Sequence, residues 1–196
     1  MNNETKTPAQ PGQYRPRLAF YHPTAKGTGC AIKMALHPAH DSTEGSIMLS
    51  AANQMTVGDR RGPNPTFPRF DWENAICVKL GFADLCKILQ VLRGECESID
   101  GDHGLYHRSP RGATSIQLRH VLEPLPGYSL ELYRSPAGGG EDVRSRILIN
   151  PAEAVGLCEA ISGSMSVVSF GIPMLVPHDT SAYEAQTKGF RDASAA

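Results

Sequence analysis

The pattern of apolar and polar positions predicts four strands in the first half of the chain. Residues 17–21 indicate a first strand, and residues 28–36 indicate a second one in which every other side chain is apolar. Residues 46–52 predict a third strand, and residues 70–80 predict a fourth. Between these last two, residues 56–68 carry glycine, proline and paired arginines, which is typical of a loop.

A helix is expected directly after the fourth strand. Apolar residues recur at helical spacing from Phe82 to Leu92. Gly81 is the expected N-cap, and Asp84 in the first turn suits the positive end of the helix dipole. Gly94 stands where a C-terminal stop is expected. The first half of the chain therefore predicts four strands and a helix.

The second half predicts the same order of elements. Strands are expected over residues 104–107, 113–123, 128–134 and 144–149, and a turn at residues 124–127 joins the middle two. The whole chain therefore predicts an α+β fold built from two copies of one unit.

The second helix has a well-marked start. Asn150 is the expected N-cap, Pro151 occupies the first helical position, and Glu153 completes a capping box. The apolar face of this helix is expected to consist of Ala154, Val155, Leu157, Cys158 and Ile161.

The repeat is also visible residue by residue. Residues 21–29 read Tyr-His-Pro-Thr-Ala-Lys-Gly-Thr-Gly, and residues 106–114 read Tyr-His-Arg-Ser-Pro-Arg-Gly-Ala-Thr. Both segments carry an aromatic residue, a histidine, a short turn with proline, a base and a glycine, and both lead into an alternating strand. A self-similar unit of this kind fixes the architecture and predicts one domain with internal pseudo-symmetry.

The domain is expected to span residues 16–176, with one repeat over 16–100 and the other over 101–176. Residues 1–15 are polar and rich in proline and glutamine, and we expect a disordered N-terminal tail. Residues 177–196 are polar without a clear element, and we expect a flexible C-terminal tail.

Composition narrows the class of protein. A hydrophobic content of 40% and a charged content of 20% are ordinary for a soluble globular chain. Without a run of about 20 apolar residues or a secretory signal, we expect a cytoplasmic protein with no membrane partner, nucleoid-associated in a bacterial host. The formal net charge of −1 means that any polyanion must be held by a local basic face rather than by the overall field.

The sequence contains no recognisable catalytic, metal or cofactor motif. The five cysteines form no Cys-x-x-Cys pair, and most lie in apolar patterns, where they are expected to act as small buried hydrophobes. Residues 37–41 (His-Pro-Ala-His-Asp) lack a partnering cysteine or carboxylate at a ligand's spacing and are expected to form a turn. The three glycines at 138–140 lie between strands, which does not suit a phosphate loop. We expect a protein that is not an enzyme and needs no cofactor.

Several motifs in the right order resemble the Whirly family of single-stranded DNA-binding proteins, whose fold is shared by kinetoplastid guide-RNA-binding proteins. Residues 26–31 resemble the family's Lys-Gly-Lys-Ala-Ala motif, with Thr28 in place of the second lysine. Residues 70–72 (Phe-Asp-Trp) resemble its aromatic-Asp-Trp signature. Residues 121–128 are similar to its second-unit hairpin, and residues 147–149 to the strand before its capped helix.

The resemblance covers roughly residues 17–170 and implies both a fold and a function. The fold would be two crossed four-stranded antiparallel sheets with the helices packed behind them. The function would be non-enzymatic binding of single-stranded DNA along the sheets, with little sequence preference, in replication, recombination or repair. Family members assemble as tetramers, so a homotetramer is expected.

The repeat supplies candidate residues for this function. Non-specific binding of a single strand needs cations along the phosphates and flat faces that stack on bases. The candidate nucleic-acid-binding residues are Tyr21, His22, Lys26, Lys33, Arg60, Arg61, Tyr106, His107, Arg108, Arg111, Arg119 and Arg134. Trp72 is expected to be structural, because it precedes a buried strand next to a helix.

Other interpretations remain open at this level. Tyr21 and Tyr106 would also suit the core or an interface, and the bases would also suit ordinary solvation. One alternative is a nucleic-acid-binding protein whose ligand is RNA, such as an RNA chaperone of the same fold. An alternative of a different class is an oligomeric scaffold that kept the fold and binds protein.

Overall fold

The computed structural model describes residues 17–40, 43–59, 61, 63–110, 112–123 and 125–171. The predicted tails, 1–15 and 177–196, lie outside the described residues. The elements in order are β1 (Leu18–His22), β2 (Cys30–His37), β3 (Ser46–Thr56), β4 (Arg69–Phe70), β5 (Ile76–Leu80), α1 (Phe82–Leu92), the short 3₁₀ helix η1 (Ile99–Asp102), β6 (Leu105–Ser109), β7 (Gly112–Val121), β8 (Gly127–Pro136), β9 (Val143–Ile149) and α2 (Pro151–Phe170).

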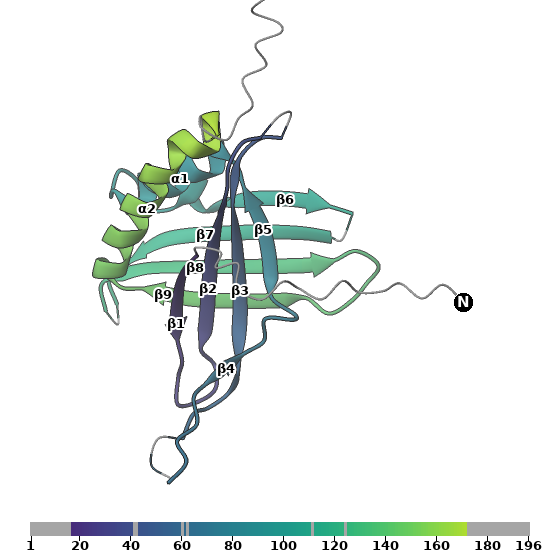
Figure 1. The fold of residues 1–196 in the computed structure, drawn as a ribbon, viewed down its shortest axis with the longest axis vertical. Helices are drawn as coiled ribbons and strands as arrows, with labels where there is room; N and C mark the ends of the chain where they lie inside the picture. Colours follow the sequence, from purple (N-terminus) through teal and green to yellow (C-terminus); the bar gives the residue numbers. More distant parts are fainter. Residues whose placement is uncertain are drawn as a thin grey trace, which may run out of the picture.

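The strands form two antiparallel sheets, one from each repeat. In the first sheet β1, β2 and β3 pair in order, and β3 pairs with both β5 and the short β4. In the second sheet β6, β7, β8 and β9 pair in order. The sheets cross each other, with the helices gathered at one end (Figure 1). The predicted α+β fold of two four-strand-and-helix units is confirmed.

The predicted fourth strand over residues 70–80 is wrong in one respect, because the chain breaks it into β4 and β5. The carboxylate of Asp71 accepts hydrogen bonds from the backbone N–H of Asn74 (3.1 Å) and from its side-chain amide (2.9 Å). Such a local side-chain turn competes with strand pairing. The bonds from Asn74 also hold the pKa of Asp71 below its usual value.

Strand alternation gives each sheet an inner and an outer face. In the first sheet Ile32 pairs with Phe20 and with Ala51, and in the second Ile116 pairs with Leu105 and with Leu132. The inner faces and both helices contribute to a single core, whose largest fully buried side chains are Ile32, Leu49, Ile76, Leu80, Leu85, Ile99, Ile116, Leu118, Leu132, Ile149, Leu157 and Ile161.

Both helices begin where the sequence predicts. At α1 the backbone N–H of Gly81 donates to Asp84 Oδ2 at 3.0 Å. At α2 the backbone N–H of Glu153 donates to Asn150 Oδ1 at 2.9 Å, and the N–H of Asn150 donates back to Glu153 Oε2 at 3.0 Å. The predicted apolar face of α2 is wrong at Val155, which is 66% exposed. Of the helices in the described part of the chain, neither is long and apolar enough to cross a membrane.

Neighbouring residues of β9 offer a test of these faces. Ile149 is 1% exposed and Leu148 is 44% exposed. Ile149→Ala should lower the free energy of unfolding by about 2–5 kcal/mol, because it leaves a cavity in the core. Leu148→Ala, on the outer face, should cost less than about 1 kcal/mol. Urea unfolding curves measure both, and equal losses would contradict the assigned faces.

Candidate functional site

The strand register places the two repeats in equivalent positions. Tyr21 of β1 pairs with Ala31 of β2, and Tyr106 of β6 pairs with Ser115 of β7. Both tyrosines are exposed. The two outer faces therefore begin with the same aromatic residue on the same strand of each sheet, as the sequence repeat predicts.

The outer face of the first sheet carries a cluster of aromatic rings. The ring of Tyr21 lies edge-on to Phe70 at 5.7 Å and to Trp72 at 6.3 Å between centroids. The ammonium nitrogen of Lys33 lies 3.3 Å from the centroid of the Trp72 ring, a cation–π contact. Burial, together with the charge of Arg17, lowers the pKa of Lys33. We call Tyr21, Lys33, Phe70 and Trp72 the aromatic face.

Phe70 and Trp72 were not among the candidate residues of the sequence. Both are half-buried rather than part of the fully buried core, and both contact the exposed Tyr21. A signal was present in the sequence, because two aromatic residues two positions apart in an extended segment fall on one face.

The outer face of the second sheet carries an ionic cluster next to its exposed tyrosines, Tyr106 and Tyr133. The carboxylate of Glu131 accepts a hydrogen bond of 2.5 Å from Arg144 Nη2, and Arg146 Nε lies 3.3 Å from its other oxygen. Arg146 Nε also donates to Ser129 Oγ at 3.1 Å. Burial raises the pKa of Glu131, but the hydrogen bond from Arg144 and the charges of Arg144, Arg146 and Arg119 outweigh burial and lower it. We call Arg119, Glu131, Arg144 and Arg146 the arginine face.

Arg144 and Arg146 are also absent from the sequence-based set, although the strand pattern could have found them. They alternate with Ser145 and Ile147, both buried, so the two arginines share the outer face of β9. The register puts Arg144 in the cross-strand row of Tyr106 and Tyr133. The hydroxyl of Tyr133 donates to the carboxylate of Asp142.

The two predicted histidines are tied to helix starts. His22 Nε2 lies 2.7 Å from Glu153 Oε1, and His107 Nε2 lies 3.4 Å from Asp84 Oδ2. Each histidine thus contacts the capping carboxylate of the helix in the other repeat. Both side chains remain 30% exposed beside that carboxylate.

Arg134 belongs to a second pair of equivalent contacts in which each repeat binds the other. Its guanidinium donates to the carbonyl of Ala75 at 3.1 Å and to that of Asn74 at 3.4 Å. At the equivalent position of the first repeat, the side-chain amide of Asn53 donates to the carbonyl of Arg144 at 2.9 Å. Arg134 therefore joins the two repeats, a place that the sequence did not indicate.

Of the remaining predicted cations, the four in the described part of the chain are exposed. Lys26 lies in the turn between β1 and β2, and Arg61 lies in the loop after β3. Arg108 lines a hollow of about 530 Å³ together with Tyr106, at the tip of the β6–β7 hairpin. Arg119 belongs to the arginine face. Arg60 and Arg111 lie outside the described residues.

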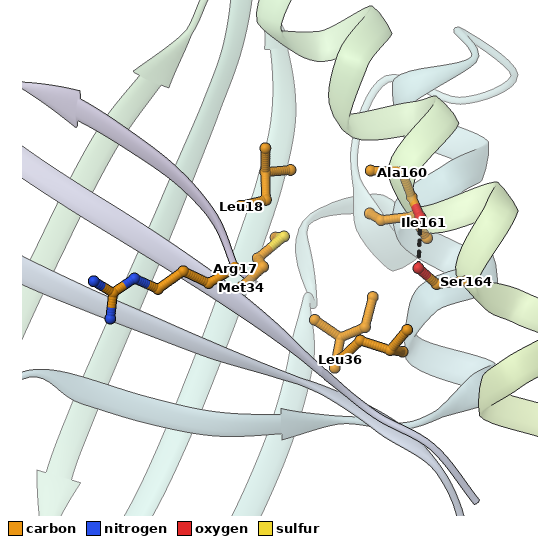
Figure 2. Close-up of a pocket in the computed structure, with 8 residues that line it drawn as sticks. Arg17, Leu18, Met34, Leu36, Ala160, Ile161 and Ser164 are labelled. Atoms are coloured by element: carbon orange, nitrogen blue, oxygen red, sulfur yellow. Dashed lines mark hydrogen bonds between the residues drawn. The ribbon is translucent and has the colours of Figure 1, made fainter. Parts of the chain in front are cut away.

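A further cavity, of about 300 Å³, is apolar and lies away from both outer faces. Figure 2 shows Leu18, Met34 and Leu36 of the first sheet on one side of it and Ile161 of α2 on the other. Ser164 belongs to the same wall, and its hydroxyl donates to the carbonyl of Ala160 at 2.7 Å. Arg17 is the cation among these lining residues, and none of them is aromatic, so the cavity lacks the flat rings on which bases would stack.

In the described part of the chain, no group of three or more His, Cys, Asp or Glu side chains is placed to hold a metal ion. The five cysteines are free thiols, and the expectation that most are buried is wrong, because only Cys30 is fully buried whereas Cys77 and Cys96 are exposed. Burial raises the pKa of the Cys30 thiol to about 11, although backbone hydrogen bonds act in the opposite direction.

Solved structures with the same arrangement identify the fold. The Whirly protein WHY1 of Arabidopsis thaliana superposes with a TM-score of 0.63 at 15% identity, covering 94% of this chain and 95% of that one. The chain has the Whirly fold. The plant transcriptional regulator PBF-2, also a Whirly protein, gives a TM-score of 0.60 at 19% identity, with 80% and 84% covered.

The Whirly fold extends to RNA-binding proteins among the solved structures. Trypanosome MRP1/MRP2 superposes with a TM-score of 0.54 at 15% identity, covering 79% of this chain and 86% of that one. A guide-RNA-binding protein complex bound to a guide RNA gives 0.53 at 15% identity, with 82% and 97% covered. No protein-family model and no curated protein sequence matches the chain.

A double-mutant cycle tests the contact between repeats at His22 and Glu153. The combined change His22→Ala with Glu153→Ala should be less destabilising than the sum of the single changes, by about 0.5–1 kcal/mol, because each single change already breaks the 2.7 Å contact. Urea unfolding gives all four free energies. His37, exposed at the end of β2, serves as the control, and His37→Ala should add to Glu153→Ala. Additive behaviour for His22 would rule out the contact.

Proposed function

We propose that this chain is a non-enzymatic protein that binds single-stranded nucleic acid, preferably DNA, along the outer faces of its two sheets. The observation that carries the proposal is the aromatic face, where Tyr21, Phe70 and Trp72 form one cluster beside the Lys33 ammonium. Aromatic rings and cations side by side are what a strand without fixed sequence requires, since every base has a flat face.

The energetics fit this ligand. Stacking of a base on an aromatic side chain contributes about 1–3 kcal/mol. Cations that neutralise phosphates release counterions, which makes affinity depend on salt. Because the formal net charge is −1, the attraction has to come from local groups such as Lys26, Lys33 and Arg108.

The cellular role that we propose is protection or remodelling of exposed DNA strands in replication, recombination or repair, with little sequence preference. The compartment would be the cytoplasm, at the nucleoid in a bacterium. A second candidate is RNA binding, and the similarity to a guide-RNA-binding complex solved with its RNA favours it.

Fluorescence anisotropy with labelled strands of about 30 nucleotides tests the function, because that length covers several typical site sizes. Single-stranded DNA should bind more tightly than RNA of equal length and sequence, and both more tightly than duplex DNA. The logarithm of the affinity should fall linearly with the logarithm of the salt concentration. Absence of binding to either single strand at low salt would refute the proposal, and tighter binding of RNA would favour the second candidate.

We also propose that the protein is a homotetramer that associates through its helices. Its support is α2, which leaves Val155 and Phe170 exposed although both are apolar. Light scattering coupled to size exclusion should give about 85 kDa, four times the 21.2 kDa chain. Val155→Glu should shift the mass downward, whereas Glu159→Gln, on the same helix, should not. A monomer mass for the unmodified chain would contradict the tetramer.

A further inference from the structure

We infer that Arg144 and Arg146 form a phosphate-binding subsite where the two repeats meet, so that the arginine face holds the backbone of a strand while the aromatic face stacks its bases. The inference rests on the proposed function. It assigns binding of the strand's backbone to the second sheet and stacking of its bases to the first. It concerns residues that neither the sequence motifs nor the repeat indicates.

The carboxylate of Glu131 holds the two guanidiniums in place but does not use all of their N–H donors. Arg144 reaches it through Nη2 and Arg146 approaches it through Nε, at 2.5 Å and 3.3 Å. A guanidinium has five N–H donors, so each side chain keeps others for a second anion. The side chains of Arg144 and Arg146 are 66% and 54% exposed, whereas that of Glu131 is 18% exposed. The acid therefore lies beneath, and the bases face solvent.

The arginines border a hollow that the other repeat completes. A space of about 350 Å³ is lined by Arg144 and Arg146 of β9 together with Asn53 and the Gly27-Thr28-Gly29 turn between β1 and β2. The Asn53 amide holds the backbone of Arg144 at its carbonyl. Glycine is required at position 29 of this turn, because a Cβ there would collide with the carbonyl oxygen of His22. Small residues on one wall and guanidiniums on the other suit a phosphate group.

The local charge also suits an anion. Three arginines, Arg119, Arg144 and Arg146, act on the single carboxylate of Glu131. The cluster is therefore positive in a chain whose formal net charge is −1. Arginine grips phosphate with two parallel N–H groups, which gives geometry as well as charge.

The equivalent positions of the first repeat lack this cluster. Glu131 stands between Gln117 and Arg146 in the second sheet, and its counterpart Ser50 stands between Lys33 and Cys77 in the first. Serine and cysteine replace the acid and its arginine there. The two outer faces therefore differ in chemistry, although they share strand order and register.

Salt-dependent anisotropy with single-stranded DNA separates the two faces. Arg144→Gln with Arg146→Gln should weaken binding about tenfold at low salt and reduce the slope of log affinity against log salt by about 0.7 for each phosphate that is no longer neutralised. Trp72→Leu should weaken binding and leave that slope unchanged, because stacking releases no counterions. Lys87→Gln, which removes a partly exposed cation of helix α1 rather than of a sheet, is the control and should have little effect.

A strand of deoxyribose phosphates without bases distinguishes backbone binding from base binding. It should bind the unmodified chain and Trp72→Leu equally well, and the double arginine variant at least tenfold more weakly. Inorganic phosphate at millimolar concentration should compete only weakly, because one phosphate lacks the neighbours of a strand. If the unmodified chain binds DNA while the arginine variant matches Lys87→Gln in affinity and slope, the subsite is wrong and the function stands. If the unmodified chain binds no strand, both are wrong.

Discussion

Both sheets turn an apolar face toward the same core, and neither can bury that face alone. Ile32 and Leu49 of the first repeat and Ile116 and Leu132 of the second belong to one buried cluster. A four-stranded sheet with one helix is marginal in water when an apolar face stays uncovered. When the two sheets cross, each covers the apolar face of the other. The side chains of the outer faces are then not needed to fill the core.

Polar contacts at the crossing repeat with the same symmetry. His22 contacts the helix-capping acid of the second repeat, and His107 contacts that of the first. Asn53 and Arg134, at equivalent strand positions, each donate to a main-chain carbonyl of the other repeat. These contacts fix the position of one sheet over the other, because each joins a strand residue of one repeat to a defined point of the other. The β1–β2 turn is thereby held beside β9, which creates the hollow at Arg144 and Arg146.

Local signals were sufficient to predict most of the fold. Helix starts at Gly81 and Asn150 follow from capping chemistry within four residues, and alternation located the strands. The break between β4 and β5 was missed because Asp71 and Asn74 form a turn inside an apolar pattern that otherwise indicates one strand. Val155 was assigned to the buried face of α2 on spacing alone, but spacing does not show how much of a helix its neighbours cover.

The candidate site was harder to predict, because a side chain's role depends on which residues of the other repeat lie opposite it. The repeat identified Tyr21 and Tyr106 by position, and both lie on outer faces. It also identified His22 and His107, but the carboxylates they contact are more than a hundred and about twenty positions away, respectively, in the other repeat. Glu131, Arg144 and Arg146 were overlooked because they have no counterpart in the first repeat, and a comparison of the repeats finds only the residues that they share.

The reciprocal histidine contacts have a consequence for how such a chain can arise. When residue i of one unit contacts residue j of another, and j of the first contacts i of the second, the interface is of the kind found in two-fold symmetric homodimers. The two repeats are thus related like the subunits of a dimer joined end to end in one polypeptide. In a true homodimer every substitution appears twice. In a fused one, a single face can acquire Glu131 and its arginines while the other retains its aromatic rings.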